Sequence, residues 1–496
     1  MKKNSRIAIA GSGPVGCYLA IRLVEIGYTN IVCIESGSSD GESPNLNRNT
    51  YHFETPSAMP EQVHQFGGGG NLWFGRVGEF SEIDFNERPG LGISKWPFQK
   101  SEIEKCYQKV RQILEVEQKS DELFVHDIFE RLELKLPREF DIQVFQHINP
   151  LILKRKMMDL IHSGKVKLVD FTTILKISRI GDEVFVDTIN REKFHKKFEF
   201  DYIFLATGTM QTTAIINRSL GQEKSSKLKI GTNLMEHFDM FIGELSVKKT
   251  NIQELTKLCL NRRRELSLMA MNLGVGFKPS KEVLMNKQFL NVSLEVVPKT
   301  SIYLFAPEKY LNKSKNRNQV IRMMFFFERV FKRTRRFYEE SLKRDKLRVF
   351  SLWLKAEELP YEKSLLRFHD SPNGSLVYSH QISDKTFLEL NRVLDWINRV
   401  VVEKNLGSIQ WRPTLFNKEL LCKSYLNWHP SGTLRMGSNQ DETVCDDGLQ
   451  VHDLKGVFVV SAAVFPTSSN ANPTFTCLAL AERCLEKFFE KNERRS

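Results

Sequence analysis

The stretch "RIAIAGSGPVGCYLAIRLVEIGYTNIVCIESG", residues 6–37, decides the fold. Residues 6–10 form a short apolar run that is typical of a buried strand. From Val15 to Ile26, apolar residues recur at helical spacing, and a second apolar run follows at residues 30–35. The pattern predicts a strand, a helix and a second strand parallel to the first, and therefore an α/β protein.

Three glycines in this stretch predict what the unit binds. Gly11, Gly13 and Gly16 form G-x-G-x-x-G between the first strand and the helix. Such glycines permit a tight turn, a close approach of the backbone to a pyrophosphate, and packing of helix on strand. Glu35 ends the second strand, where an acid can accept hydrogen bonds from ribose hydroxyls. These four residues predict a dinucleotide site, but the motif leaves NAD and FAD as alternatives.

Composition narrows the class of protein. The 496 residues exceed one simple domain, and two large or three small domains are expected. The net charge is +12, but no zinc-finger or aromatic RNA-binding pattern accompanies it, so we expect no nucleic-acid partner. Eight cysteines are spread without a C-x-x-C pair, which predicts no metal site and favours a reducing, cytoplasmic location. The N-terminus is interpreted as a strand rather than an export signal, and no apolar run is long enough to span a membrane.

Further stretches add small-residue turns. "FGGGGNLWFGR" (66–76) holds four consecutive glycines, whose backbone can lie flat against a ring or a phosphate. "DYIFLATGTMQTTAIINRS" (201–219) predicts a strand, a small-residue turn and a helix. In 456–489, a strand leads through a small-residue loop to Asn472-Pro473, which is a typical helix start, and then to an amphipathic helix.

Together these stretches make the chain resemble the glucose–methanol–choline (GMC) oxidoreductase family, flavoproteins that oxidise alcohols. The resemblance covers most of the length, with the motifs in the family's order. Besides the glycines and Glu35, it is carried by the Gly-rich segment with Trp73 and Arg76, "SKWPFQKSEIEKCY" (94–107), "ATG" (206–208), "NLMEH" (233–237), "HPSGTLRMG" (429–437) and "AAVFPTSSNANPTFT" (462–476).

The resemblance implies two domains. One is an FAD-binding Rossmann-like domain built from residues 1–95, 140–240 and 425–496. The other is a substrate domain of residues 241–424, with parts of 96–139, built on an antiparallel sheet flanked by helices. The positions that match the family's cofactor contacts are Gly11, Gly13, Gly16, Glu35, Gly68, Gly69, Asn71, Trp73, Ala206, Gly208, Ala462, Ala463, Pro473 and Thr474.

The resemblance also implies a catalytic pair. His429 matches the histidine that accepts the alcohol proton while a hydride leaves for flavin N5, and Asn472 matches its partner before the last helix. The chemistry is reasonable because removal of hydride is easier from a carbon whose oxygen is becoming an alkoxide, and histidine is a suitable base near pH 7. For Asn472 the alternative is a purely structural N-cap. His237 lies in a family motif but is interpreted as structural.

Three positions depart from the family pattern. Leu72 stands where some members attach the flavin through a histidine, so non-covalent FAD is expected. The turn at Ser461–Ala463 lacks the acid that the family often has, so backbone N–H groups are expected to contact the pyrophosphate there. Phe74 interrupts a "W-G-G" segment of many relatives.

The middle of the chain resembles the family least. Residues 351–370 and 374–383 predict strands, and 384–407 predicts an amphipathic helix. Residues 323–350 are strongly basic, with apolar residues near helical spacing. One interpretation is a solvated helix that packs on the substrate domain, and the other is a peripheral membrane or anionic-partner contact.

The predicted function is therefore an FAD-dependent alcohol oxidoreductase. It would transfer a hydride from a CH–OH group to flavin. The group is expected to belong to a sugar, cyclitol or polyol, and a lipid-like or aromatic alcohol is the alternative that the Phe-rich stretch 325–331 favours. The sequence leaves the electron acceptor open among oxygen, a quinone and a carrier protein. Two alternatives remain: a flavin monooxygenase or isomerase on the same fold, and a non-catalytic FAD-fold scaffold. The pairing of His429 with Asn472 argues against the first, and the intact glycines, Glu35 and His429 argue against the second.

Overall fold

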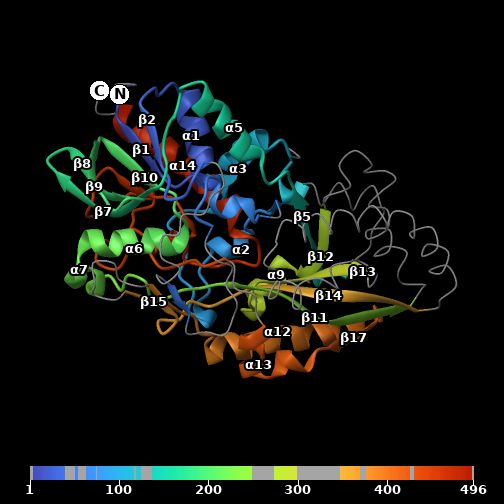
Figure 1. Cartoon of the computed structure of the whole chain (residues 1–496). Coiled ribbons are helices and arrows are strands. Elements are labelled where there is room, and N and C mark those ends of the chain that lie inside the picture. Colours follow the sequence, from blue (N-terminus) through green and yellow to red (C-terminus); the bar gives the residue numbers. More distant parts are fainter. Residues whose placement is uncertain are drawn as a thin grey trace.

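The computed structural model describes residues 4–39, 51–53, 63–73, 75–116, 119–123, 137–248, 273–298, 347–368, 376–424 and 429–493. Two large sheets organise these residues (Figure 1). One is parallel and carries the N-terminal glycine motif, and the other is antiparallel and lies beside it. Two three-stranded sheets complete the described fold.

The parallel sheet has the strand order β18-β10-β1-β2-β6. Each neighbouring pair is parallel, and β1 lies between β10 and β2. The sheet confirms the predicted strand–helix–strand unit. Its strands are β1 (Ile7–Ala10), β2 (Ile31–Ile34), β6 (Lys167–Val169), β10 (Tyr202–Leu205) and β18 (Val457–Val459).

Helices from both ends of the chain cover the parallel sheet. α1 (Pro14–Ile26) contacts the C-terminal α14 (Pro473–Glu493), which also contacts α3 (Lys100–Leu114). α5 (Ile152–His162) packs on α1, and α6 (Gly208–Leu220) follows β10. The core therefore joins segments that are far apart in sequence.

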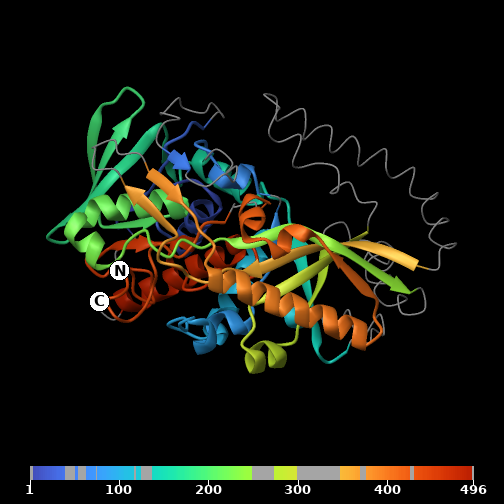
Figure 2. The same ribbon diagram turned by 90° about the horizontal axis from the view of Figure 1, so that it is seen from below.

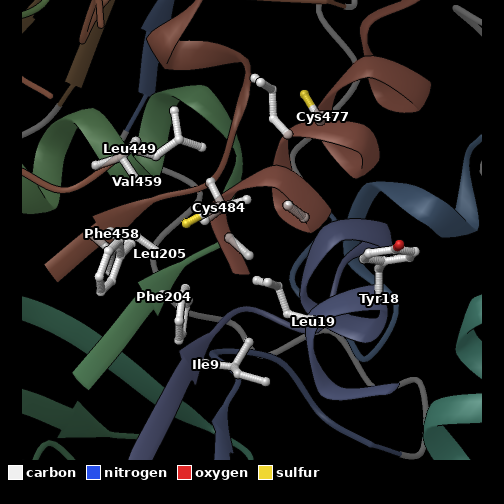
Figure 3. Packing of buried hydrophobic residues seen from close by; sticks show 14 of the residues in the cluster. Ile9, Tyr18, Leu19, Phe204, Leu205, Leu449, Phe458, Val459, Cys477 and Cys484 are labelled. Atoms are coloured by element: carbon white, nitrogen blue, oxygen red, sulfur yellow. The ribbon is translucent and has the colours of Figure 1, made fainter. Parts of the chain in front are cut away.

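Figure 3 shows this core at close range. Ile9 of β1, Leu19 of α1 and Phe204 of β10 are fully buried, as are Val459 of β18 and Cys484 of α14, at 1% exposure or less. Parallel strands with helices on their faces are expected to be apolar on both sides, as these are. Burial of this kind positions the turn at the end of β1.

The antiparallel sheet has seven strands in the order β17-β11-β14-β13-β12-β5-β4. Residues 76–77 and 140–147, within the ranges predicted for the FAD-binding domain, form its edge strand β4 and the neighbouring strand β5. The division into domains at the stated boundaries remains a prediction. The strands are β4 (Arg76–Val77), β5 (Phe140–His147), β11 (His237–Lys248), β12 (Leu273–Pro279), β13 (Val292–Pro298), β14 (Leu347–Glu357) and β17 (Ser408–Trp411).

One face of this sheet is apolar and lies on α12 (Asp384–Glu403), as seen from below in Figure 2. The helix confirms the expectation for 384–407, although it ends at Glu403. Ser383 caps it by accepting a hydrogen bond from the backbone N–H of Thr386. Leu354 of β14 and Leu390 of α12 are fully buried in the resulting core.

The remaining elements are short. The small sheets are β15-β16-β3 and β7-β8-β9. Their strands are β3 (Tyr51–Phe53), β7 (Thr172–Ile180), β8 (Glu183–Asn190), β9 (His195–Phe200), β15 (Leu365–Phe368) and β16 (Leu376–Ser379). The helices are η1 (Gly68–Asn71), α2 (Glu82–Phe85), η2 (Pro89–Leu91), α7 (Gln222–Lys227), α9 (Lys281–Lys287), η6 (Pro413–Phe416), α13 (Lys418–Ser424) and η7 (Ala462–Val464).

The predicted basic helix at 323–350 falls mostly outside the described residues, which resume at Leu347. Residues 347–350 are the start of β14, so the helical prediction is wrong for these four, because they pair with β11 and β13. Among the described residues, no helix combines the length and the apolar character needed to cross a membrane.

Candidate active site

The turn after β1 has the geometry expected for a dinucleotide site. Gly11 has a φ of 89°, and a Cβ there would lie 2.8 Å from the carbonyl oxygen of Ala206. A Cβ on Gly16 would lie 1.9 Å from the carbonyl oxygen of Gly11. By contrast, a Cβ on Gly13 would meet no described atom within 4 Å. The turn is therefore closed toward the protein and open at Gly13, where a phosphate would approach.

Glu35 lies beside this turn and is 5% exposed. Its carboxylate accepts hydrogen bonds from the backbone N–H and the hydroxyl of Ser12, at 2.9 and 2.6 Å, and from the backbone N–H of Gly37 at 2.8 Å. The acid is thus held rigidly at the end of β2.

The Gly-rich segment folds over the same turn as η1. A Cβ on Gly68 would lie 3.3 Å from the Cα of Gly13, whereas one on Gly69 would have open space within 4 Å among the described residues. Asn71 ties the segment together, because its amide donates to the carbonyl of Gly68 at 3.1 Å and its oxygen accepts from Lys154 Nζ at 2.8 Å. η1 and the β1 turn therefore border one space.

The residues after η1 differ in role. Trp73 is half-buried, and its Nε1 donates to the carbonyl of Arg76 at 3.2 Å. Leu72 has a hydrocarbon side chain with no atom able to bond covalently to a flavin. Phe74 lies outside the described residues.

Two predicted motifs lie side by side near α6. The backbone N–H groups of Gly432 and Leu434 donate to the carbonyls of Ala462 and Ala463, at 3.1 and 2.7 Å. In place of the family's acid, the hydroxyl of Ser461 accepts from the Ala463 N–H at 3.3 Å. The nearby turn at Ala206–Gly208 ends β10 and begins α6, with Gly208 at a φ of 73°.

The structure brings the two predicted catalytic residues together. His429 Nε2 lies 3.4 Å from the amide nitrogen of Asn472. Asn472 directly precedes Pro473, the first residue of α14, and Thr474 follows in its first turn. The carbonyl of Pro430 accepts from the hydroxyl of Thr209 in α6 at 2.5 Å, which anchors the histidine loop. Residues 43 positions apart thus converge.

His237 lies directly behind His429, which the sequence analysis did not anticipate. Its Nε2 is 2.6 Å from His429 Nδ1, and the two ring centroids are 4.7 Å apart. His237 is the first residue of β11 and is 1% exposed. The signal was present in the "NLMEH" motif, but nothing in the sequence linked that motif to a residue 192 positions away.

The residues before His237 clamp the same loop. The carboxylate of Glu236 accepts from the backbone N–H of His429 and from the hydroxyl of Tyr378, both at 2.6 Å. Met235 and Ser431 exchange two backbone hydrogen bonds, at 3.0 and 2.8 Å. Burial raises the pKa of Glu236 to about 7, against the opposing effects of His380 and Tyr378.

The electrostatic setting keeps His429 neutral. Burial lowers its pKa to about 4, with Lys355 and Arg76 adding to the shift and Asp239 opposing it. At pH 7 the imidazole is therefore uncharged, and one ring nitrogen retains a lone pair.

The second face of the antiparallel sheet carries a charged cluster that sequence reasoning missed. The Asp239 carboxylate pairs with Lys355 Nζ and accepts from Trp353 Nε1 at 3.0 Å. Arg76 Nη2 lies 2.8 Å from both carboxylate oxygens of Glu295. We call these five residues the polar cluster.

Strand register places the polar cluster on the face that bears His237. Asp239 is two residues after His237 on β11 and lies opposite Lys355 on β14. Alternate residues of a strand share a face, so Asp239 lies roughly 7 Å along the strand from His237. Lys355 has no solvent exposure, and Asp239 retains 26%. Alternation of polar and apolar residues in β11 and β14 was the available signal.

Residues 381–481 match a family model described as GMC oxidoreductase. The matched segment includes His429 and Asn472. The chain is 35% identical over 102 residues to C-glycoside 3-oxidase of Arthrobacter globiformis, which is 20% of this chain and 19% of that protein. It is 38% identical over 60 residues to choline oxidase of Arthrobacter globiformis, 12% of this chain and 11% of that protein. The matched stretches thus span less than a fifth of these relatives.

Solved structures match over the whole chain. Pyridoxine 4-oxidase from Mesorbium loti aligns with a TM-score of 0.61 at 15% identity, covering 98% of this chain and 99% of that one. A formate oxidase of Aspergillus oryzae aligns with a TM-score of 0.57 at 12% identity, covering 99% of both chains. At these identities the likeness shows the fold, and it confirms the predicted α/β class with a Rossmann-like part and an antiparallel sheet. Residues 381–481 are thus similar to the GMC oxidoreductase family, and the chain as a whole shares the fold of these solved structures.

Proposed function

We propose that this protein is an FAD-dependent oxidoreductase that acts on CH–OH groups. The observation that carries the proposal is the convergence of His429 Nε2 and the Asn472 amide, 3.4 Å apart, from two separate motifs. A base and a hydrogen-bonding amide at one point suit an alcohol, whose hydroxyl must be held and deprotonated.

The residues around the β1 turn suit FAD. The open space at Gly13 and Gly69 would admit the pyrophosphate, and Glu35 would accept from ribose hydroxyls. FAD, when bound, would supply the hydride acceptor. The other proposed contacts are Gly11, Gly16, Gly68, Asn71, Trp73, Ala206, Gly208, Ala462, Ala463, Pro473 and Thr474.

We further propose that FAD is held non-covalently, because Leu72 offers no nucleophile. Acid denaturation of the purified yellow protein should release the flavin into the supernatant. Flavin that stays with the precipitated chain would contradict the proposal.

In the proposed reaction His429 takes the hydroxyl proton. The neutral ring has a lone pair for it, since burial lowers the pKa of His429 to about 4. Asn472 donates a hydrogen bond to the substrate oxygen and orients it. As the proton moves to His429, negative charge grows on that oxygen and eases departure of the hydride from the same carbon.

The polar cluster supports a substrate with several hydroxyl groups, such as a sugar, cyclitol or polyol. Asp239 and Glu295 accept hydrogen bonds, whereas Lys355 and Arg76 donate them, all on the sheet face that bears His237. A simple aliphatic alcohol would form no hydrogen bonds with these groups, which already pair with one another, and would gain no binding energy from them. The name of the relative C-glycoside 3-oxidase points to the same class.

A panel assay tests the function. Anaerobic mixing with polyols and with simple alcohols, followed at the flavin absorbance band, should show reduction by at least one polyol. Reoxidation with oxygen, a quinone or a carrier protein then identifies the acceptor. A colourless protein that cannot be reconstituted would favour the scaffold alternative, and flavin reduced only by a nicotinamide cofactor would favour a monooxygenase.

Three further proposals rest on fewer observations. A cytoplasmic location is proposed from the sequence, in which eight cysteines are spread along the chain without a C-x-x-C pair. Contact of 323–350 with an anionic partner is proposed from sequence alone, and flotation with anionic liposomes at low salt tests it. We also propose the division into an FAD-binding domain and a substrate domain at the boundaries given above. Limited proteolysis can map these boundaries.

A further inference from the structure

We propose that His237 is a positioning residue that fixes the tautomer of His429, an inference that rests on the proposed function. His429 would keep its proton on Nδ1 and present the lone pair of Nε2 to the substrate. The argument starts from the 2.6 Å contact between His237 Nε2 and His429 Nδ1.

Only one proton can lie between two neutral imidazole nitrogens. If His237 Nε2 carried it, His429 Nδ1 would accept, and the proton of neutral His429 would reside on Nε2. That tautomer could not accept a substrate proton. If His429 Nδ1 carries the proton instead, Nε2 is free to act as a base.

Asn472 decides between these two arrangements. Its amide nitrogen, at 3.4 Å from His429 Nε2, is a donor and requires an acceptor. When this contact is a hydrogen bond, Nε2 holds a lone pair, and the proton that we propose on Nδ1 is donated to His237.

The setting of His237 makes it a dependable acceptor. It is 1% exposed, so water does not compete for the contact. Burial, with nearby His429 and Lys355, lowers the pKa of His237 well below its usual range and keeps the ring neutral. A protonated His237 would donate through Nε2 and force His429 into the other tautomer.

Hydrogen bonds of the main chain fix the position of His429 relative to His237. The backbone N–H of His429 is held by Glu236, the residue next to His237, at 2.6 Å. The backbone bonds between Met235 and Ser431 join the same two segments. The "NLMEH" segment thus sets both the position of His429 and the side of the ring that keeps its proton.

The pair also accounts for the proton after the reaction. The substrate O–H bond breaks as its proton bonds to His429 Nε2, a carbonyl group forms, and the hydride would pass to the bound flavin, the oxidant of the proposed function. The resulting imidazolium keeps its Nδ1–H bond to His237, so no second proton transfer is needed.

The test compares His237→Leu, which removes the acceptor, with His237→Gln, whose amide oxygen can replace it. In flavin-loaded protein labelled with ¹⁵N-histidine, we expect wild-type His429 to show an unprotonated Nε2, and the Leu variant to show a mixture of tautomers. The rate of flavin reduction should fall by about 10- to 100-fold in the Leu variant, and the Gln variant should recover most of it.

His452→Leu is the matched control, because it removes a histidine whose partner is the Thr443 hydroxyl on the loop before β18. It should change neither the His429 signals nor the rate. An unchanged tautomer and rate in folded, flavin-loaded His237→Leu would overturn the inference. Failure of the proposed function would give a different result from failure of this inference, because the flavin of His429→Ala would then be reduced at the wild-type rate.

Discussion

The two faces of the seven-stranded sheet are built from the same strands and have opposite characters. Phe238, Leu294 and Leu354 point to the face that packs on α12, in an apolar core. Their neighbours Asp239 and Lys355 point to the face that bears His237 and carry the polar cluster.

The contrast between the apolar and the polar face indicates that one sheet can contribute to both stability and substrate recognition. Because side chains alternate along a strand, each β-strand supplies one set of residues to the core and another to the site. The apolar face should determine whether the chain folds, whereas the polar face should determine what it binds.

The largest expected effect comes from the apolar face. Leu354→Ala removes a fully buried side chain and should lower the free energy of unfolding by about 2–5 kcal/mol. Urea denaturation followed by fluorescence measures it. Ser351→Ala, on the polar face of the same strand, should cost under about 1 kcal/mol, because its hydroxyl makes no hydrogen bond among the described residues. Equal costs would break the comparison between faces.

An intermediate effect on stability is expected from the Asp239–Lys355 ion pair of the polar cluster. Lys355→Met leaves the Asp239 carboxylate without its cation and should destabilise by about 2–3 kcal/mol at pH 7. The double variant Asp239→Asn/Lys355→Met should recover part of that loss, because no unpaired charge then remains. A double variant that is less stable than the single one would contradict this prediction.

The same pair predicts a pH dependence. Burial opposes ionisation of Asp239, but Lys355 and Arg76 outweigh it and lower its pKa to about 2. Because this pKa is depressed in the folded state, the pair stabilises the fold above the usual aspartate pKa of about 4, by about 2 kcal/mol. That stability is lost as the pH falls from about 4 to about 2. The difference between wild type and Lys355→Met should therefore shrink over this window, and a constant difference would refute the assignment.

The smallest effect is expected at Trp353, whose Nε1–H donates to Asp239. Trp353→Phe keeps an aromatic ring and removes one hydrogen bond, so stability should change by about 1 kcal/mol. If the polar cluster binds substrate, the Michaelis constant for a polyol should rise more than the turnover number falls. An effect on turnover alone would place Trp353 outside the binding surface.

Four of the five strands of the parallel sheet could be predicted from sequence because their signals are local, whereas β6 was not predicted. Gly11, Gly13, Gly16 and Glu35 lie within one unit, and helical spacing identified α1. Strand β18 and the start of α14 at Pro473 could also be predicted, because small and turn-forming residues lie between them.

The site itself was only half predictable. His429 and Asn472 came from motifs, but the contact of His429 with His237 depends on how β11 meets a loop 192 residues later. The polar cluster depends on the register between β11 and β14, which pairs Asp239 with Lys355 across a long connection. Such non-local pairing leaves no trace in short sequence patterns.

The central claim is that His429 is the base of an alcohol oxidation at a flavin, and one measurement tests it directly. Purified His429→Ala and wild type are each mixed anaerobically with a polyol found in the panel, and flavin reduction is followed by rapid absorbance. We predict that the variant retains FAD and is reduced about 10²- to 10⁴-fold more slowly. Reduction of the flavin-loaded variant at the wild-type rate would contradict the account.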